Sequence, residues 1–283
     1  MTDARPRVAL VTGCSSGIGH ATARRLQQAG LTVYASARRP DTLADLAGAG
    51  IRTVRIDVTD DASIDDAVKG IVSDSGRLDV LVNNAGYRVV GPVEEVGTDE
   101  VIRLFDTNVF GVVRLIRTVL PVMRENRYGR IVNLSSIFGR FAIPGGAYPA
   151  ATKHAVEAIS DGLRLEVAPF GIRVVLIEPS SVRSRYDANA VWSGDESAGP
   201  YAKFNRDVAR WHAEALAGPP YNLPGRLALA PEDVARVITR AVLSPRPRAR
   251  YPVGKLSRPV FLLRRTLPGP LFDMFVRRQF PAP

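Results

Sequence analysis

The sequence predicts a doubly wound α/β fold built on one parallel sheet. Apolar, β-branched runs alternate with helical segments, which is the pattern of consecutive βαβ units. A glycine-rich turn directly follows the first of these runs and opens the first helical segment. The chain has 283 residues, of which 46% are hydrophobic, so it can bury one large core. We therefore expect a single domain over residues 1–283.

Each element follows from this alternation. Strands are expected at residues 7–12, 32–37, 52–57, 80–83, 130–135 and 173–178, with a last short strand at 250–253. Helical segments are expected at residues 17–30, 41–47, 63–75, 101–124 and 150–170, and Pro231 suits the first turn of another helix. Residues 180–230 are rich in Gly, Pro and aromatic residues and are interpreted as an inserted substrate lid. Residues 254–283 form an apolar and basic tail.

Composition narrows the class of protein. Cys14 is the only cysteine and there are three histidines, so we expect neither a disulfide framework nor a metal site. The short polar start runs into the first strand, and no apolar run reaches the roughly 18 residues that span a bilayer. A cytoplasmic location is therefore expected. The net charge of +10 is interpreted as a solvated arginine-rich surface, without nucleic-acid binding. The tail is expected to cover the substrate pocket or a neighbouring subunit, and membrane contact is the less favoured alternative.

The glycine-rich turn at residues 11–19 has the context of a phosphate-binding loop. It connects a predicted strand to a predicted helix and reads Thr-Gly-Cys-Ser-Ser-Gly-Ile-Gly from Thr12. Glycines allow the backbone to approach a pyrophosphate, and the helix N-terminus supplies N–H donors and partial positive charge. The loop therefore predicts a dinucleotide site.

Three further motifs follow the loop along the chain. They are Asp57-Val58, the Asn-Asn-Ala-Gly run at residues 83–86, and the strand end at residues 131–136. In this order the motifs resemble the short-chain dehydrogenase/reductase family over residues 7–184. The resemblance implies a Rossmann-type sheet of about seven strands with helices on both faces, and a nicotinamide-dependent oxidoreductase such as a ketoreductase. It also implies a homodimer or homotetramer packed through residues 101–124 and 150–170.

The resemblance also assigns the cofactor site. The residues it implies are Gly13, Ser15, Ser16, Gly17, Ile18, Gly19, Asp57, Val58, Asn83, Ala85, Gly86, Lys153, Pro179, Val182 and Ser184. Ser180 departs from the glycine that usually follows the proline at this position. No acid follows the second strand to bind ribose hydroxyls; Arg38, with Arg39, stands there instead. An arginine at this position accommodates a 2′-phosphate, so NADP(H) is expected in preference to NAD(H).

Carbonyl reduction needs a proton donor, a second hydrogen bond to the carbonyl oxygen, and a cation that lowers the donor's pKa. The resemblance assigns Asn108 to a proton-relay position, Ser136 to the hydrogen bond and Lys153 to the cation, which also holds the nicotinamide ribose. The proton donor of the family is a tyrosine four residues before the lysine. In this chain Pro149 occupies that place, and Tyr148 lies five residues before Lys153.

The displaced tyrosine leaves two arrangements open. Positions five apart on a helix diverge by roughly 140°, so Tyr148 and Lys153 cannot cooperate on a regular helix. Pro149 biases the preceding residue toward extended backbone and suits a first helical residue, so the helix is expected to begin just after Tyr148. Either the preceding loop bends the phenol back toward Ser136, or the phenol points away and no donor remains at the usual place.

Two functions follow from these motifs. The first is an NADP(H)-dependent oxidoreductase that interconverts a ketone and a secondary alcohol on a bulky hydrophobic substrate, such as a polyketide, steroid or lipid. Aromatic residues of the insertion favour that substrate; they are Trp192, Tyr201, Phe204, Trp211 and His212. Pro149 favours the alternative, a redox-neutral enzyme of the same fold (a cyclase, isomerase or dehydratase) or a cofactor-binding pseudoenzyme.

Overall fold

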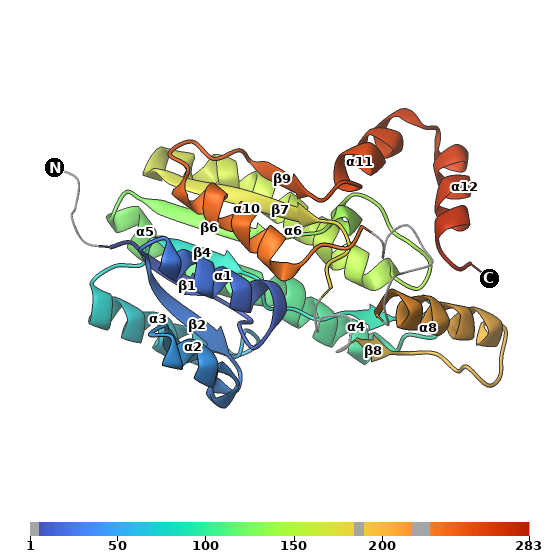
Figure 1. Cartoon of the computed structure of the whole chain (residues 1–283), viewed down its shortest axis with the longest axis horizontal. Helices are drawn as coiled ribbons and strands as arrows, with labels where there is room; N and C mark the ends of the chain where they lie inside the picture. Colours follow the sequence, from blue (N-terminus) through green and yellow to red (C-terminus); the bar gives the residue numbers. More distant parts are fainter. Residues whose placement is uncertain (1–5, 184–189, 217–226, 283) are drawn as a thin grey trace.

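The computed structural model describes residues 6–183, 190–216 and 227–282. Its main sheet has seven parallel strands in the order β3-β2-β1-β4-β6-β7-β9, with helices on both faces (Figure 1). The strands are β1 (Val8–Val11), β2 (Thr32–Ala37), β3 (Arg52–Arg55), β4 (Val80–Asn83), β6 (Gly129–Leu134), β7 (Ile172–Pro179) and β9 (Arg250–Val253). This sheet confirms the predicted fold class, and the expected strands differ from the observed ones only at their ends.

Two layers of helices cover the sheet because successive strand residues face opposite sides. On one face, Ala9 and Val11 of β1 belong to the apolar cluster that includes α1 (Gly17–Gln28) and α10 (Pro231–Leu243). On the other, Val8 and Leu10 belong to the cluster formed with the remaining long helices. These helices are α3 (Asp61–Ser75), α5 (Gly111–Glu125) and α6 (Ala147–Val167). The short segments η1 (Pro40–Leu43) and α2 (Ala44–Gly48) connect β2 to β3.

The helix expected at residues 101–124 is divided into three parts. It consists of α4 (Thr98–Phe105), a π-helical turn η2 (Asp106–Phe110) and α5. Single π turns inside α-helices are frequent at functional sites. Here the turn contains Asn108, the residue assigned to the proton relay by resemblance. The hydrophobic pattern of residues 101–124 predicted one helix and did not reveal this break.

Several elements were not expected from the sequence. Residues of the insertion form β8 (Val191–Trp192), which pairs in parallel with β5 (Val89–Val90), and α8 (Ala202–Leu216). The tail forms α11 (Ser257–Thr266) and α12 (Gly269–Gln279), which stand away from the sheet at the upper right of Figure 1. None of the helices in the described part of the chain is both long and apolar enough to cross a membrane.

The order in which strands are added to the sheet reverses between β1 and β4. From β1 the order runs outward to β2 and β3 on one side, and from β4 outward to β6, β7 and β9 on the other. In open parallel sheets, ligands bind beyond the carboxyl ends of the strands at such a switch point. The fold therefore places the glycine loop after β1 beside the loop after β4.

Replacement of Ile238 by alanine tests the packing of α10. Ile238 is fully buried in the cluster shared with α1, so Ile238→Ala is expected to lower the free energy of unfolding by about 2 to 5 kcal/mol. Urea denaturation measures the change. The control is Leu243→Ala on the same helix, where 44% exposure predicts a change within about 0.5 kcal/mol. Equal losses in both variants would contradict this packing.

Candidate active site

A cleft of about 1490 Å³ lies at the carboxyl ends of the strands. Most residues expected to bind the cofactor line it, namely Gly13, Ser15, Ser16, Gly17, Ile18, Arg38, Arg39, Asp57, Val58, Ala85, Gly86, Lys153, Pro179 and Val182. Gly19 and Asn83 are not among the lining residues, and Ser184 is outside the described residues. The structure thus brings together segments that are far apart in the sequence.

The glycine loop is packed tightly against the loop after β4. Gly13 has a positive φ of 69°, and a Cβ at Gly19 would lie 2.4 Å from the Gly13 carbonyl oxygen. The Asn84 side-chain amide donates to the carbonyls of Thr12 (2.8 Å) and Gly13 (3.1 Å). In return, the Thr12 hydroxyl accepts from the backbone N–H groups of Asn84 and Ala85 at 3.0 and 3.1 Å. These contacts fix the loop's backbone from behind.

The two asparagines of the Asn-Asn-Ala-Gly run have different roles. Asn83 is buried and donates to the Asn133 side chain at 2.8 Å, so it joins β4 to β6 behind the cleft. Asn84 lines the cleft as well as holding the glycine loop. The sequence predicted that residues 83–86 line the cofactor site; Asn84 lines the cleft, whereas Asn83 does not. The strand period separates them, because adjacent residues at a strand end face opposite directions.

The N-terminus of α1 fits an anionic group. Ser16, the N-cap residue, makes no side-chain capping hydrogen bond, and the first turn of α1 contains no acid. The first N–H groups of the helix and its positive dipole end are therefore available to a phosphate. Gly17 and Ile18 of this turn line the cleft. These features fit the pyrophosphate of a dinucleotide.

Arginines gather where the adenosine half of a dinucleotide would lie. Arg38 and Arg39 line the cleft just after β2, near Asp57. Partial burial raises the pKa of Asp57, but hydrogen bonds from Thr59 and the charges of Arg38 and Arg55 outweigh it. The pKa of Asp57 is therefore held below its usual value, and the carboxylate stays charged at neutral pH.

Ser136 and Lys153 both line the cleft. The Ser136 hydroxyl accepts from Phe138 N at 3.2 Å and makes a long 3.5 Å contact to the Pro179 carbonyl. Lys153 Nζ donates to the Leu134 carbonyl at 2.7 Å. Burial lowers the pKa of Lys153 to about 8, although the charge of Glu157 opposes the shift. A lysine with this pKa is a proton donor of useful strength near neutral pH.

Tyr148 lies outside this arrangement. Its side chain packs against the apolar cluster of Val89, Val96 and Leu104, and its hydroxyl donates to the Val93 carbonyl at 3.1 Å. Pro149, not Tyr148, lines the cleft. Of the two arrangements left open by the sequence, the structure has the second, with the phenol turned away.

The start of α6 differs from the sequence prediction. The helix begins at Ala147 and includes both Tyr148 and Pro149, whereas it was expected to begin after the tyrosine. Pro149 is tolerated because the first turn of a helix has no internal partner for its N–H groups. With Tyr148 and Lys153 on one regular helix, their five-residue separation directs them to different sides.

Asn108 acts on the backbone of the loop after β4. Its side-chain amide donates to the Tyr87 carbonyl at 2.8 Å and its oxygen accepts from Tyr87 N at 3.1 Å. A longer 3.4 Å contact joins it to Thr152 on α6. Gly86 leaves the space for this contact, because a Cβ there would lie 2.8 Å from the Asn108 oxygen. Asn108 is buried and is not among the lining residues.

Aromatic and aliphatic side chains line the substrate end of the cleft. Phe138 and Ile143 come from the segment after β6, and Trp211 and His212 come from α8. Burial, with the charge of Arg88, lowers the pKa of His212 to about 4, so its ring is neutral. Its Nδ1 lies 2.9 Å from the Val208 carbonyl, which can only accept, so Nδ1 carries the proton.

The other predicted lid aromatics lie behind this wall. Trp192 contacts the His212 ring edge-on, with centroids 5.2 Å apart. Tyr201 and Phe204 belong to a small cluster with Val90 and Val208, and neither lines the cleft. Phe138, Ile143 and Tyr87 line the cleft but were not anticipated from the sequence. Only their nearness to Ser136 and to the Asn-Asn-Ala-Gly run could have indicated them.

Comparison with known proteins identifies the family. The short chain dehydrogenase family profile matches residues 7–192. The chain belongs to the short chain dehydrogenase family. It is 34% identical over 273 residues to the uncharacterized oxidoreductase YbbO of Escherichia coli, covering 95% of this chain and 93% of that protein. This membership confirms the oxidoreductase class predicted from the sequence.

Two solved structures agree with this membership. A short-chain dehydrogenase from Streptomyces avermitilis has a TM-score of 0.79 and 33% identity, covering 97% of this chain and 98% of that one. A variant of the actinorhodin polyketide ketoreductase with NADPH has a TM-score of 0.70 and 30% identity, covering 89% and 97%. Both similarities extend through most of this chain, well beyond the glycine loop.

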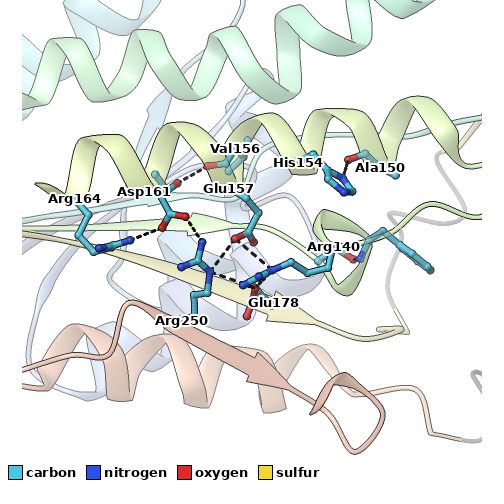
Figure 2. Close-up of polar contacts among 12 residues, drawn as sticks. Arg140, Ala150, His154, Val156, Glu157, Asp161, Arg164, Glu178 and Arg250 are labelled. Atoms are coloured by element: carbon cyan, nitrogen blue, oxygen red, sulfur yellow. Dashed lines mark hydrogen bonds and ion pairs between the residues drawn. The ribbon is translucent and has the colours of Figure 1, made fainter. Parts of the chain in front are cut away.

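A buried ionic cluster supports the active site of this short-chain dehydrogenase. Arg140 donates to Glu178 at 2.8 Å, and Arg250 Nε lies 3.1 Å from Glu157 (Figure 2). Arg250 also reaches Asp161 at 2.5 Å, and Arg164 pairs with the same carboxylate. The cluster therefore joins the segment after Ser136, the helix that carries Lys153, the end of β7 and strand β9.

The cluster's two glutamates are the least exposed of its members. The Glu157 side chain is 8% exposed and that of Glu178 1%. Burial and the charge of Glu157 raise the pKa of Glu178, against the opposing effect of Arg140 and Arg250. Gly139 permits this packing, since a Cβ there would lie 3.0 Å from Glu157 Cγ. The two arginines are thus what keeps a pair of buried carboxylates tolerable.

Removal of Arg250 is expected to destabilise the fold strongly. Arg250→Met leaves Glu157 and Glu178 with one cation, which costs about 3 to 5 kcal/mol near pH 7.5. A carboxyl whose folded pKa is raised contributes stability below its unfolded pKa and loses it as pH rises through the folded pKa. Loss of Arg250 raises the pKa of Glu178 further, so the destabilisation is expected to be smaller near pH 5.

Urea denaturation at both pH values measures this effect. Arg236→Met is the control, because Arg236 is an exposed arginine of α10 that pairs with the nearby Asp233. Its loss is expected to change stability by less than about 1 kcal/mol at either pH. A pH-independent loss in Arg250→Met would show that the buried carboxylates do not carry the effect.

Proposed function

We propose that this protein is an NADP(H)-dependent oxidoreductase that interconverts a ketone and a secondary alcohol on a bulky hydrophobic substrate. One observation carries the proposal. A single cleft joins a dinucleotide cradle, with Arg38 and Arg39 at one end, to Ser136, Lys153 and an apolar wall at the other. The structural similarity to a polyketide ketoreductase with NADPH supports both the cofactor and the substrate class.

The cofactor preference rests on charge. A 2′-phosphate would meet the guanidinium groups of Arg38 and Arg39, and arginine binds phosphate through paired, charge-assisted hydrogen bonds. No acid takes the place of these arginines at the end of β2. When bound, the nicotinamide supplies or accepts the hydride of the reaction.

Ser136 and Lys153 divide the remaining work. The Ser136 hydroxyl donates to the substrate oxygen once it releases its long contact with the Pro179 carbonyl. Lys153, with its pKa lowered to about 8, supplies positive charge and a proton at neutral pH in a site without the usual phenol. Asn108 holds the Tyr87 backbone, and so fixes the loop that would lie beneath the cofactor.

One observation favours a second candidate. Tyr148 donates to the Val93 carbonyl outside the cleft, so the proton donor that the family uses is missing from its place. A redox-neutral enzyme or a cofactor-binding pseudoenzyme would keep the cradle and the lysine without that donor. The alternative shares the cofactor prediction and differs only in whether hydride is transferred.

Assembly and location follow from exposed apolar residues and from the cysteine content. We propose a homodimer or homotetramer packed through the helices around α5 and α6, where Phe110 and Leu165 are exposed apolar residues. Such residues suit a subunit interface better than solvent. A cytoplasmic location is proposed because Cys14 is the single cysteine.

Substitution of Arg38 tests the cofactor preference. Arg38→Ser is expected to weaken NADPH binding by about 10- to 100-fold through loss of a charged phosphate contact. NADH binding is expected to change less than about threefold, because NADH lacks that phosphate. Fluorescence titration with each nucleotide measures both, and Arg240→Ser on α10 is the control. Equal weakening of NADPH and NADH would contradict the assignment.

The catalytic donor is tested by NADPH consumption with a panel of bulky ketones. Tyr148→Phe is expected to keep kcat within about twofold of the wild type, since only a hydrogen bond outside the cleft is lost. Pro149→Tyr restores the Tyr-x-x-x-Lys spacing and is expected to raise kcat by about 10-fold or more. Lys153→Met, in the same assay, is expected to abolish turnover.

The outcomes separate the two candidates. Loss of activity in Tyr148→Phe would retain the oxidoreductase but show that the phenol enters the site during turnover. A wild type that binds NADPH and reduces no ketone, while Pro149→Tyr does, would establish the redox-neutral alternative. Absence of NADPH binding in every form would contradict both.

A further inference from the structure

We propose that the two C-terminal helices, α11 and α12, dock on an anionic lipid bilayer beside the mouth of the cleft. The apolar substrate would then enter from the bilayer surface. This inference deepens the proposed function, and its substrate part rests on it. The proposed docking itself rests only on the charge, exposure and position of the C-terminal helices.

Charge is concentrated in this part of the chain. Residues 254–283 contain six cations and one acid, a net charge of +5, which is half of the +10 of the whole chain. The cations are Lys255, Arg258, Arg264, Arg265, Arg277 and Arg278, and the acid is Asp273. Clustered basic residues are attracted to the negative surface potential of anionic lipids.

The outward face of α11 combines arginine with an exposed leucine. Leu262 is 63% exposed, and Arg258 and Arg265 lie four residues before and three residues after it. Residues at these spacings share one face of a helix. Val260 and Leu263 lie on the other side of the helix and pack against the apolar cluster that contains Phe141 and Phe272. The exposed leucine is therefore flanked by cations.

The outward face of α12 repeats this combination. Leu271 and Met274 are 47% and 48% exposed, and Arg278 follows on the same face at helical spacing. Phe272 and Val276 are buried on the opposite face. Each helix thus has an apolar inner face that packs on the protein, and an outer face where apolar side chains stand among arginines.

The inner faces attach the C-terminal helices to the active-site segment. Phe272 packs on Phe141, with ring centroids 5.5 Å apart, and the same cluster contains Ile137 next to Ser136. Arg140 lies over the Phe261 ring at 5.4 Å. These inner contacts therefore explain why the C-terminal helices pack on the protein. The outer apolar residues have no role in that packing.

The end of α12 reaches the cleft. Phe280 packs on Trp211 and Phe138, with ring centroids 5.4 and 6.3 Å apart. Trp211 and Phe138 both line the cleft. An apolar molecule leaving a bilayer at the outer face of these helices would therefore meet, at the end of α12, aromatic surface continuous with the substrate end of the site.

Charge and composition favour a bilayer over other partners. A second copy of this face would bring two patches of net charge +5 together, which is unfavourable. Nucleic acid would pair with the arginines but leave Leu262, Leu271 and Met274 in water. An anionic bilayer accommodates both the arginines and the exposed apolar side chains, because headgroups pair with arginine while apolar side chains enter the acyl boundary.

Vesicle sedimentation with the full chain tests the proposal. The protein is expected to bind phosphatidylglycerol-containing phosphatidylcholine vesicles and to bind pure phosphatidylcholine at least about 10-fold more weakly. Leu262→Ser/Leu271→Ser/Met274→Ser, and separately Arg258→Gln/Arg265→Gln/Arg278→Gln, are each expected to weaken binding at least about 10-fold. Lys69→Gln/Arg117→Gln/Arg173→Gln removes the same charge from exposed or partly exposed sites elsewhere and is expected to bind nearly as well as the wild type.

Each alternative has its own result. Equal loss in the control variant would reduce the effect to overall charge and overturn the proposal. Loss only in the arginine variant, with equal binding of DNA oligonucleotides, would assign the face to a polyanion. A concentration-dependent dimer abolished by the leucine variant would make it a subunit interface. Reduction of a water-soluble ketone by all variants, measured in parallel, separates failure of docking from failure of the proposed oxidoreductase.

Discussion

The reciprocal hydrogen bonding between Thr12 and Asn84 fixes the point on which the whole site depends. Each residue follows one of the two strands between which the sheet order reverses, and each holds the backbone of the other's loop. Without this link the glycine loop and the loop after β4 would be two independent turns. With it, the two sides of the cleft share one rigid floor, and Gly19 must lack a side chain for the loops to approach.

Much of this arrangement could be predicted because it is local in the sequence. The strand period, the glycine turn and Arg38 each follow from a few adjacent residues, and resemblance to the family supplied Ser136 and Lys153. The sequence did not show which of Asn83 and Asn84 faces the cleft, because two adjacent asparagines at a strand end give no local sign of their directions. The pairing of β5 with β8, and the packing of α11 and α12 on the segment after β6, depend on contacts between segments far apart in the chain.

Tyr148 and Pro149 show how a single register change separates binding from chemistry. Lys153 keeps its place on the cleft, since its position is set by α6 and by the carbonyl of Leu134. The tyrosine, one residue out of step, is carried by the same helix toward Val93. The sequence revealed the conflict between spacing and helix geometry, but only the packing of Val89, Val96 and Leu104 around the ring decides its direction.

The small sheet of β5 and β8 connects the insertion to the loop after β4 by backbone pairing. β5 continues directly from the loop that Asn108 and Asn84 hold, and β8 belongs to the insertion that carries Trp211 and His212. A molecule that contacts Trp211 and His212 would therefore also stabilise the loop that lines the proposed dinucleotide site. Thermodynamic linkage makes such an effect reciprocal, so the two ligands would bind with positive cooperativity even though they share few residues.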